Sequence, residues 1–284
     1  MTTANLRIVP RNFHDEATLT ASEAAAGFAI ANTQATARDT VWRSTSTGTV
    51  TISGSFSRDR VVNFFGMFRH VNHGGQIRVQ LYSDAAWTTQ VDDTGTVAIN
   101  KVVGSSSDSA YAWGDDPYGD GQYDPLLTEA PYWFWFAVDR TIQSYKITLS
   151  SHAATYGYSA YWQASRLWLG KYFEPAINPS YGATSGVADN SDRNRSRGGS
   201  LRTSLGARWR AVRMSLDSVA ETEVPTWMDI LAHCQLGRDV VASLFPGDGT
   251  RRERDNLICG KFAALDVLGR QINRLTKNLA LEEV

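Results

Sequence analysis

The sequence predicts a mainly β protein of two domains, a β-sandwich followed by a smaller α+β domain with one main helix. Three observations favour this fold class. Short segments with apolar residues at alternate positions recur through the first 170 residues, as in strands with one buried face. A polar stretch without apolar periodicity follows them. The clearest helical pattern lies beyond that stretch, within residues 221–234.

The end of the predicted sandwich is marked by residues 161–169, which are rich in aromatic and aliphatic side chains, as a sheet strand requires. Gly170 can end this strand, and Pro175 and Pro179 exclude a helix or a central strand directly after it. We therefore expect this segment to close the sandwich. The predicted divisions are a sandwich over residues 1–178, a polar linker over 179–199 and an α+β domain over 200–284.

Earlier strands of the predicted sandwich follow one another closely. Residues 49–56 alternate, so that Val50, Ile52 and Phe56 fall on one face. Residues 60–68 are apolar on both faces, which predicts a strand covered from both sides. Further strands are predicted at residues 5–9, 41–44, 76–82, 131–138 and 144–150.

The second domain is organised around one predicted helix. Thr222 can cap it, Pro225 lies in its first turn, and Trp227, Ile230 and Cys234 repeat at helical spacing. A helix with one apolar stripe is expected to cover a sheet. The strands of that sheet are predicted at residues 207–216, 239–246, 256–262 and 275–284.

Composition excludes several classes of function. The 284 residues carry a formal net charge of −1, so we expect no nucleic-acid sequence recognition. No apolar run reaches the length of a signal peptide core or a membrane span, so we expect synthesis in the cytoplasm and no membrane span. Cys234 and Cys259 are too few for a metal cluster or a disulfide framework, and we expect two buried thiols and no cofactor.

One segment invites a binding hypothesis. Residues 113–125 combine Gly, Pro, carboxylates and aromatic rings, which is typical of a loop. Calcium binding through its carboxylates is one alternative, but their spacing differs from that of an EF-hand. A solvated or partner-facing loop is the simpler interpretation. The candidate contacts for a glycan or a partner protein are Trp113, Asp115, Asp116, Tyr118 and Tyr123.

The sequence contains no recognisable catalytic constellation. It lacks a nucleophile elbow, a phosphate-binding loop and a dinucleotide fingerprint. His70 and His73 lie three residues apart in a Gly-flanked turn, with no third ligand beside them, so we expect no metal site. A glycan-cleaving enzyme stays as a third alternative behind two non-enzymatic functions, and we expect a protein that is not an enzyme.

Several short segments resemble a known family. The Trp-containing residues 41–44, the apolar strand 61–68, the alternating residues 75–82 and the run 166–175 are similar to the galactose-binding-like jelly rolls in tail-tip proteins of long-tailed (siphophage-type) bacteriophages. The strand–helix–strand–strand order ending at residues 278–284 is similar to the ring-forming domains of tail tubes and distal tail proteins. The usual distal tail protein has its ring domain first, and here the order is reversed.

This resemblance implies a structural component of a phage tail tip or baseplate. Such a component would form a homo-oligomeric ring, a hexamer rather than a trimer, that connects the tail tube to hub or fibre proteins. The protein would then be located in the virion tail tip. The alternative is a carbohydrate-binding module that recognises a host cell-surface glycan.

We expect the ring contacts in the second domain, because its strands at residues 201–216 and 275–284 look like unpaired sheet edges. Basic and acidic side chains would meet across the contact, and apolar side chains would supply its stability. The alternative is that these strands pair only within one monomer. The predicted interface residues are Arg208, Trp209, Arg210, Val212, Arg213, Leu279, Leu281, Glu282 and Glu283.

Overall fold

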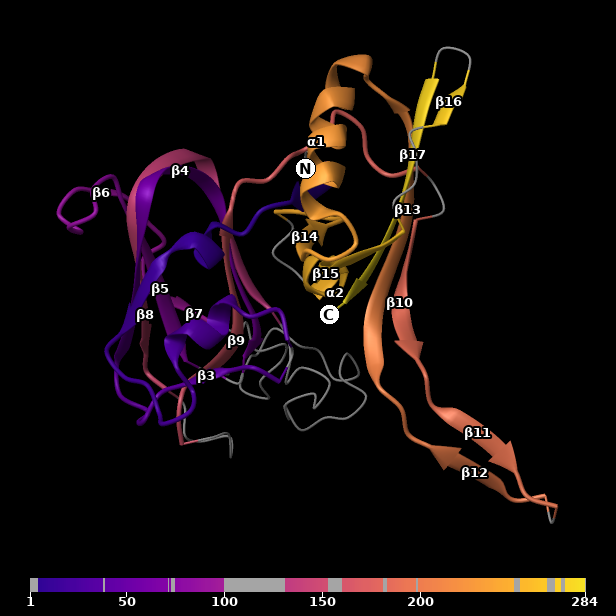
Figure 1. Cartoon of the computed structure of the whole chain (residues 1–284), viewed down its shortest axis with the longest axis horizontal. Helices are drawn as coiled ribbons and strands as arrows, with labels where there is room; N and C mark the ends of the chain where they lie inside the picture. Colours follow the sequence, from indigo (N-terminus) through magenta and orange to yellow (C-terminus); the bar gives the residue numbers. More distant parts are fainter. Residues whose placement is uncertain are drawn as a thin grey trace, which may run out of the picture. The chain divides into compact units, whose positions relative to one another are not determined.

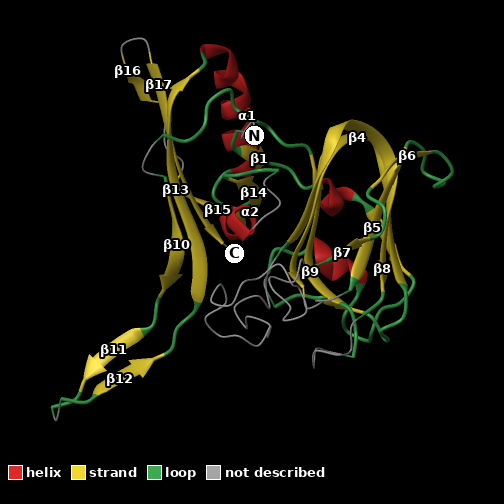
Figure 2. Ribbon diagram, turned by 180° about the vertical axis from the view of Figure 1, so that it is seen from behind, coloured by secondary structure: helices red, strands yellow, loops and turns green. Residues whose placement is uncertain are grey.

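The chain forms two compact units, and strands predominate in both (Figures 1 and 2). The first unit is Asn12–Gly170, and the second joins Met1–Arg11 to Lys171–Val284. This is the mainly β fold with one main helix that the sequence predicts. The computed structural model describes residues 5–37, 39–70, 72, 75–99, 131–152, 160–180, 183–197, 199–247, 251–264, 269–271 and 274–283.

The first unit is a sandwich built around two long strands, β4 (Val50–His70) and β8 (Tyr132–Ser150). They pair with each other along most of their length and curve over one end of the unit in Figure 2, so their halves belong to different layers. The sheet order is β3-β9-β4-β8-β5-β6, with β2 beside β4 and β7 beside β5. The shorter elements are η1 (Phe13–Glu16), β2 (Thr18–Ala21), η2 (Ile30–Gln34), β3 (Trp42–Arg43), β5 (Gln76–Tyr82), β6 (Gln90–Asp93), β7 (Val97–Ala98) and β9 (Gln163–Gly170).

The core of this unit follows the predicted alternation. Val50, Ile52 and Phe56 are all buried in it, as predicted. The predicted strands at residues 49–56 and 60–68 are one continuous strand, β4, whose register shifts between Ser55 and Arg60. A bulge takes up the polar residues at this point, so the ladder resumes without a turn.

The second unit is a sheet with the order β1-β14-β15-β17-β13-β10, to which β16 adds beside β17. The predicted helix is α1 (Val224–Cys234), and its residues Trp227, Ile230 and Cys234 are buried in the core of this unit. The remaining elements are β1 (Arg7–Val9), β10 (Thr184–Asp189), β11 (Asp192–Arg195), β12 (Leu201–Ser204), β13 (Arg208–Val219), η5 (Glu221–Glu223), β14 (Val240–Ser243), α2 (Arg251–Asn256), β15 (Leu257–Ala264), β16 (Gly269–Gln271) and β17 (Arg274–Glu283).

The predicted sandwich, residues 1–178, is too long at both ends, because the observed unit is Asn12–Gly170. Strand β1 pairs with β14, with Arg7 opposite Ser243, and Ile8 is also bridged to Phe173. Alternation within residues 5–9 predicts a strand but contains no information about which sheet receives it. The N-terminal strand therefore belongs to the second unit.

The segment predicted as a linker, residues 179–199, contains strands in the structure. It contains β10 and β11, which form a hairpin with β13 and β12. Nearly all of its side chains are exposed, so neither face of the hairpin has the apolar alternation that predicts a strand. Exposure on both faces explains why its sequence looks like a linker.

Candidate functional site

The predicted binding loop cannot be placed, because Trp113, Asp115, Asp116, Tyr118 and Tyr123 all lie outside the described residues. The other predicted contacts, on β13 and β17, lie within them.

The apolar residues of the predicted interface are core residues of the second unit. Val212, Leu279 and Leu281 are each at most 2% exposed. Strand β17 lies between β15 and β13, with Leu281 opposite Val212, so it is an inner strand and not an edge. The packing that the sequence suggested between subunits is therefore made within one chain, as the monomeric alternative requires.

The charged residues of the predicted interface divide into two groups. Arg210 and Glu283 form an ion pair of 2.7 Å within the chain, beyond the end of the buried face of β13 and β17. Arg208 contacts Asp189 at 3.4 Å across the hairpin. Arg213 and Glu282 are exposed on the opposite face, and Trp209 is half-buried.

A hairpin extends beyond the sheet of this unit. We call this hairpin, residues 187–210, the arm. Pairing between β13 and β17 begins at Ala211, so the arm has only two strands (Figure 1). Its sequence contains six arginines and two aspartates, a formal net charge of +4. The sequence predicted Arg208 and Arg210 as interface residues and assigned the arginines before residue 200 to a linker, because an exposed polar hairpin and a linker have the same composition.

A kink in the arm is fixed by close backbone contacts. Asn190 donates its backbone N–H to the carbonyl oxygen of Ala207 at 3.2 Å, and Gly206 donates to Oγ of Ser191 at 2.9 Å. A Cβ atom on Gly206 would lie 2.7 Å from the carbonyl group of Asn190, too close for any side chain. The kink therefore requires glycine at position 206.

The turn of the arm is equally defined. Ser196 donates its N–H to the carbonyl oxygen of Ser200, and Gly199 donates to that of Ser196, both at 2.9 Å. Gly199 has a φ of +83°, a conformation that favours glycine. Two glycines thus specify the path of the arm, one at the kink and one at the turn.

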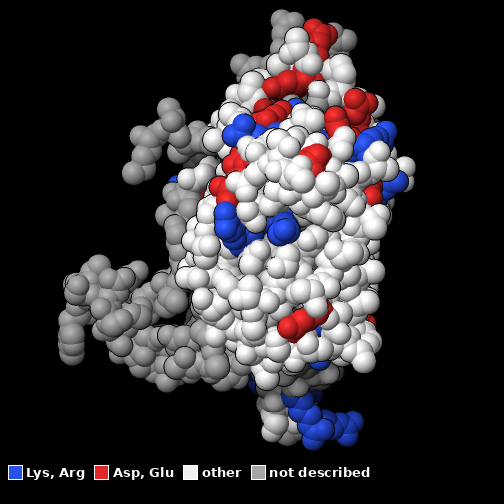
Figure 3. Space-filling model, turned by 90° about the vertical axis from the view of Figure 1, so that its left-hand side faces the viewer, with Lys and Arg blue, Asp and Glu red and all other residues white. Residues whose placement is uncertain are grey.

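The surface of the arm combines basic and apolar side chains. Val187, Leu201 and Leu205 are 68%, 55% and 79% exposed. Leu201 lies opposite Arg195 in the hairpin, so their side chains share a face. In Figure 3, basic side chains gather at the lower end of the view, where the arm lies.

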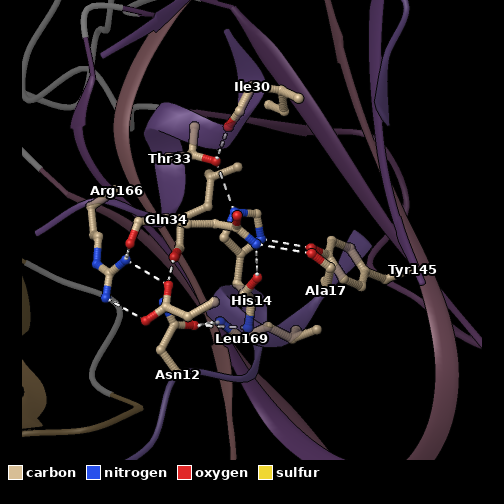
Figure 4. Close-up of polar contacts among 11 residues, drawn as sticks. Asn12, His14, Ala17, Ile30, Thr33, Gln34, Tyr145, Arg166 and Leu169 are labelled. Carbon is tan, nitrogen blue, oxygen red and sulfur yellow. Dashed lines mark hydrogen bonds and ion pairs between the residues drawn. The ribbon is translucent and has the colours of Figure 1, made fainter. Parts of the chain in front are cut away.

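A second polar cluster lies inside the sandwich, centred on His14 (Figure 4). Thr33 donates its hydroxyl to the carbonyl oxygen of Ile30 at 2.7 Å, so it accepts from Nε2 of His14 at 2.8 Å. Nδ1 of His14 then accepts the hydroxyl of Tyr145 at 2.6 Å. Burial, with a smaller contribution from the charge of Arg166, lowers the pKa of His14 to about 3.

The neighbours of His14 join separate elements of the sandwich. Arg166 on β9 donates to both carboxylate oxygens of Asp15, at 2.6 and 2.7 Å, and to the carbonyl oxygen of Gln34 at 2.6 Å. Asn12 accepts from the N–H groups of His14 and Leu169. Burial also raises the pKa of Tyr145 well above its usual value, so both rings stay neutral. The hydrogen bonds of this cluster hold separate elements of the sandwich together, which is a structural role.

The cysteines and the helices add no further candidate. Cys234 and Cys259 are both buried, as predicted, and burial raises the pKa of the Cys234 thiol to about 12. Among the described residues, no group of three or more His, Cys, Asp and Glu side chains is arranged to hold a metal ion. None of the described helices has the length and apolar character needed to cross a membrane.

Comparison with known proteins finds similarity only at the level of solved structures. No family model and no curated protein matches the sequence. A family 32 carbohydrate-binding module from C. perfringens NanJ, solved with galactose, matches with a TM-score of 0.38 and 11% identity over 59% of this chain and 99% of that chain. Chitosan-binding module 1 from a Paenibacillus sp. IK-5 chitosanase/glucanase matches with a TM-score of 0.37 and 16% identity over 56% of this chain and 98% of that chain.

Catalytic proteins also occur among the matches. A Ruminococcus gnavus fucosidase in complex with fucose matches with a TM-score of 0.38 and 13% identity, covering 58% of this chain but 27% of that chain. Similarity at this level identifies no family for the chain.

Proposed function

We propose that this protein is a non-catalytic structural component of a multi-subunit assembly, the tail tip or baseplate of a long-tailed phage. In this assembly it forms a homo-oligomeric ring that connects the tail tube to hub or fibre proteins. The resemblance of its sequence segments to phage tail-tip proteins supports the place of assembly. The single observation that supports assembly itself is the arm.

The arm is energetically unfavourable in an isolated chain. A two-stranded hairpin is marginally stable in water by itself, and this one exposes three large apolar side chains. It contributes nothing to the core of its own unit, yet Gly206 and Gly199 specify its path closely. A defined, basic and apolar projection of this kind is suited to contact with another subunit.

Electron microscopy of the purified full chain tests this function. We expect closed rings, with six copies as the sequence resemblance suggests, at micromolar protein concentration. Single copies at every concentration would contradict the proposed function.

A second candidate is a carbohydrate-binding module for a host cell-surface glycan. The observation that favours it is the concentration of aromatic rings and carboxylates at residues 113–125, because sugar rings stack on aromatic side chains. A glycan array tests it with the Trp113→Ala variant, with Trp87→Ala, a half-buried tryptophan of the same unit, as the matched control. Glycan binding that is lost in the first variant and kept in the second would favour this function, and turnover of a polysaccharide would contradict both candidates.

A further inference from the structure

We infer that the arm of one chain docks on helix α1 of a second copy of this chain, in a head-to-tail contact. This inference rests on the proposed function, because it specifies which surfaces meet in the ring. The receiving surface consists of four exposed residues on α1 and directly after it, which we call the helix patch: Met228, Asp229, Ala232 and Leu236.

Exposed apolar side chains mark both surfaces. Among the described residues, five large apolar side chains are more than half exposed, and all five belong to the arm or to the helix patch. Val187, Leu201 and Leu205 lie on the arm. Met228 and Leu236, which are 54% and 53% exposed, lie on the helix patch. Each surface therefore leaves apolar area in water that the other can cover, and such burial is the main source of stability in a contact between chains.

Charge complements these apolar groups. The arm has a formal net charge of +4, whereas residues 221–238, which include the helix patch, have three acidic residues and one basic residue, a net charge of −2. Asp229 of the patch is exposed and forms no ion pair with another described residue. On the arm, Arg193 and Arg195 share a face with Leu201. Two arms repel each other, so the arm is matched to a helix patch and not to another arm.

The two surfaces of one chain are too far apart to meet. Strand β13 connects the arm to η5 and α1, and its twelve residues span about 40 Å at about 3.3 Å per residue. Helix α1 has eleven residues and returns by only about 16 Å. Figures 1 and 2 show α1 near one end of this unit and β11 and β12 at the other. The contact therefore joins different chains.

The difference between the two surfaces determines the kind of assembly. A contact between two identical patches closes a two-fold dimer, whereas a contact between two different patches continues from subunit to subunit and can close a ring. Each copy offers its arm to one neighbour and its helix patch to another. The proposed ring is the closed assembly that such a contact forms.

Substitutions on each surface test the contact. Leu205→Glu places a carboxylate on the arm and Met228→Glu places one on the helix patch, both at exposed positions that the fold should tolerate, as circular dichroism checks. We expect each variant alone to assemble at least about tenfold more weakly than the wild type in light scattering. The matched control Val138→Glu changes a valine that is 49% exposed and outside both surfaces, and it should assemble within about threefold of wild type.

Mixing the two variants tests the head-to-tail direction. The Met228→Glu chain keeps an intact arm and the Leu205→Glu chain keeps an intact helix patch, so one intact contact can form between one chain of each kind. An equimolar mixture should give pairs at twice 31.3 kDa, which neither variant forms alone. A mixture that stays at 31.3 kDa would overturn the inference.

Cross-linking of otherwise unchanged chains identifies the occupant. A photo-reactive amino acid replaces Leu201, and chains with this replacement are mixed with an excess of unmodified chains labelled with nitrogen-15. We expect the cross-links to join the arm to labelled peptides from residues 221–238, that is, to the helix patch of another copy.

Each other outcome has a defined meaning. Cross-links to the arm or the sandwich unit of another copy, cross-links within one chain, or single variants that assemble as the wild type does would overturn the inference and leave the proposed function standing. A wild-type chain that forms no assembly under any of these conditions would overturn both.

Discussion

His14 is the residue whose chemistry depends most strongly on burial. Its pKa is lowered to about 3 in the folded chain, against 6.5 for an ordinary histidine. Between these values the unfolded chain binds a proton that the folded chain does not, so unfolding is favoured as the pH falls. The contribution of His14 to stability is therefore complete above about pH 6.5 and is lost progressively as the pH approaches 3.

Burial of His14 makes the stability of the fold depend on pH. Between about pH 7 and pH 5 the His14 linkage should lower the free energy of unfolding by about 2 kcal/mol, since each pH unit below the unfolded pKa contributes about 1.4 kcal/mol. Urea unfolding followed by tryptophan fluorescence measures it. The His14→Gln variant should be less stable at neutral pH but should lose that amount of pH dependence. An unchanged pH dependence in the variant would show that His14 is not neutral in the fold.

At the scale of the elements, β13 changes its role along its length, from arm to core. Val212 is 2% exposed against Leu281 of β17, whereas Val187 on β10, opposite Arg210, is 68% exposed. In the sequence, Val212 begins an alternating apolar run with Met214 and Leu216, whereas Val187 lies between Gly186 and Ala188. Strand β17 beside Val212 supplies its burial, and Val187 has no such third strand beside it.

The two valines form a matched pair for a stability measurement. Val212→Ala should lower the free energy of unfolding by about 2 kcal/mol, because a buried side chain loses its packing. Val187→Ala should leave it unchanged within about 0.5 kcal/mol. Thermal unfolding of both variants in dilute solution checks this prediction, and equal effects would contradict the assignment of core and arm.

Elements whose burial is one-sided could be predicted from the sequence. Helix α1 and the inward residues of β4 have one apolar face each, and periodicity reveals such faces. The arm could not be predicted, because both of its faces are exposed. The partner of β1 could not be predicted either, since Arg7 and Ser243 lie at opposite ends of the sequence.

The candidate site was predicted only in part, and for a related reason. The sequence predicted the arginines around Arg208 and the two terminal glutamates as groups of a contact between subunits. It could not show that Arg210 and Glu283 pair within one chain, because this depends on β17 lying beside β13. The buried cluster around His14 joins residues up to 157 positions apart, so no local sequence pattern predicts it.

At the scale of the whole molecule, the chain passes between its two units at residues 11–12 and again at 170–171. The arm lies within the second unit and does not join the two units. Trypsin is expected to cut the arm at one of its exposed arginines. The two fragments should then stay together in gel filtration, because β10 pairs with β13 and β1 pairs with β14 on opposite sides of the cut.

A linker at residues 179–199 predicts a different result for the same digestion. The fragments would separate into two folded domains under native conditions. Denaturing electrophoresis confirms the cut in either case, and native gel filtration decides between them.

The mass of the protein in solution shows whether this chain assembles with itself through the arm. A shortened variant replaces residues 190–207 with Asn-Gly, a two-residue turn that can join Asp189 to Arg208, its partner across the hairpin. Mass photometry should find the full chain at a multiple of 31.3 kDa, six copies in the predicted ring, and the shortened variant as single copies with unchanged circular dichroism. A full chain that stays at 31.3 kDa, or a shortened chain that assembles as the full chain does, would contradict the account.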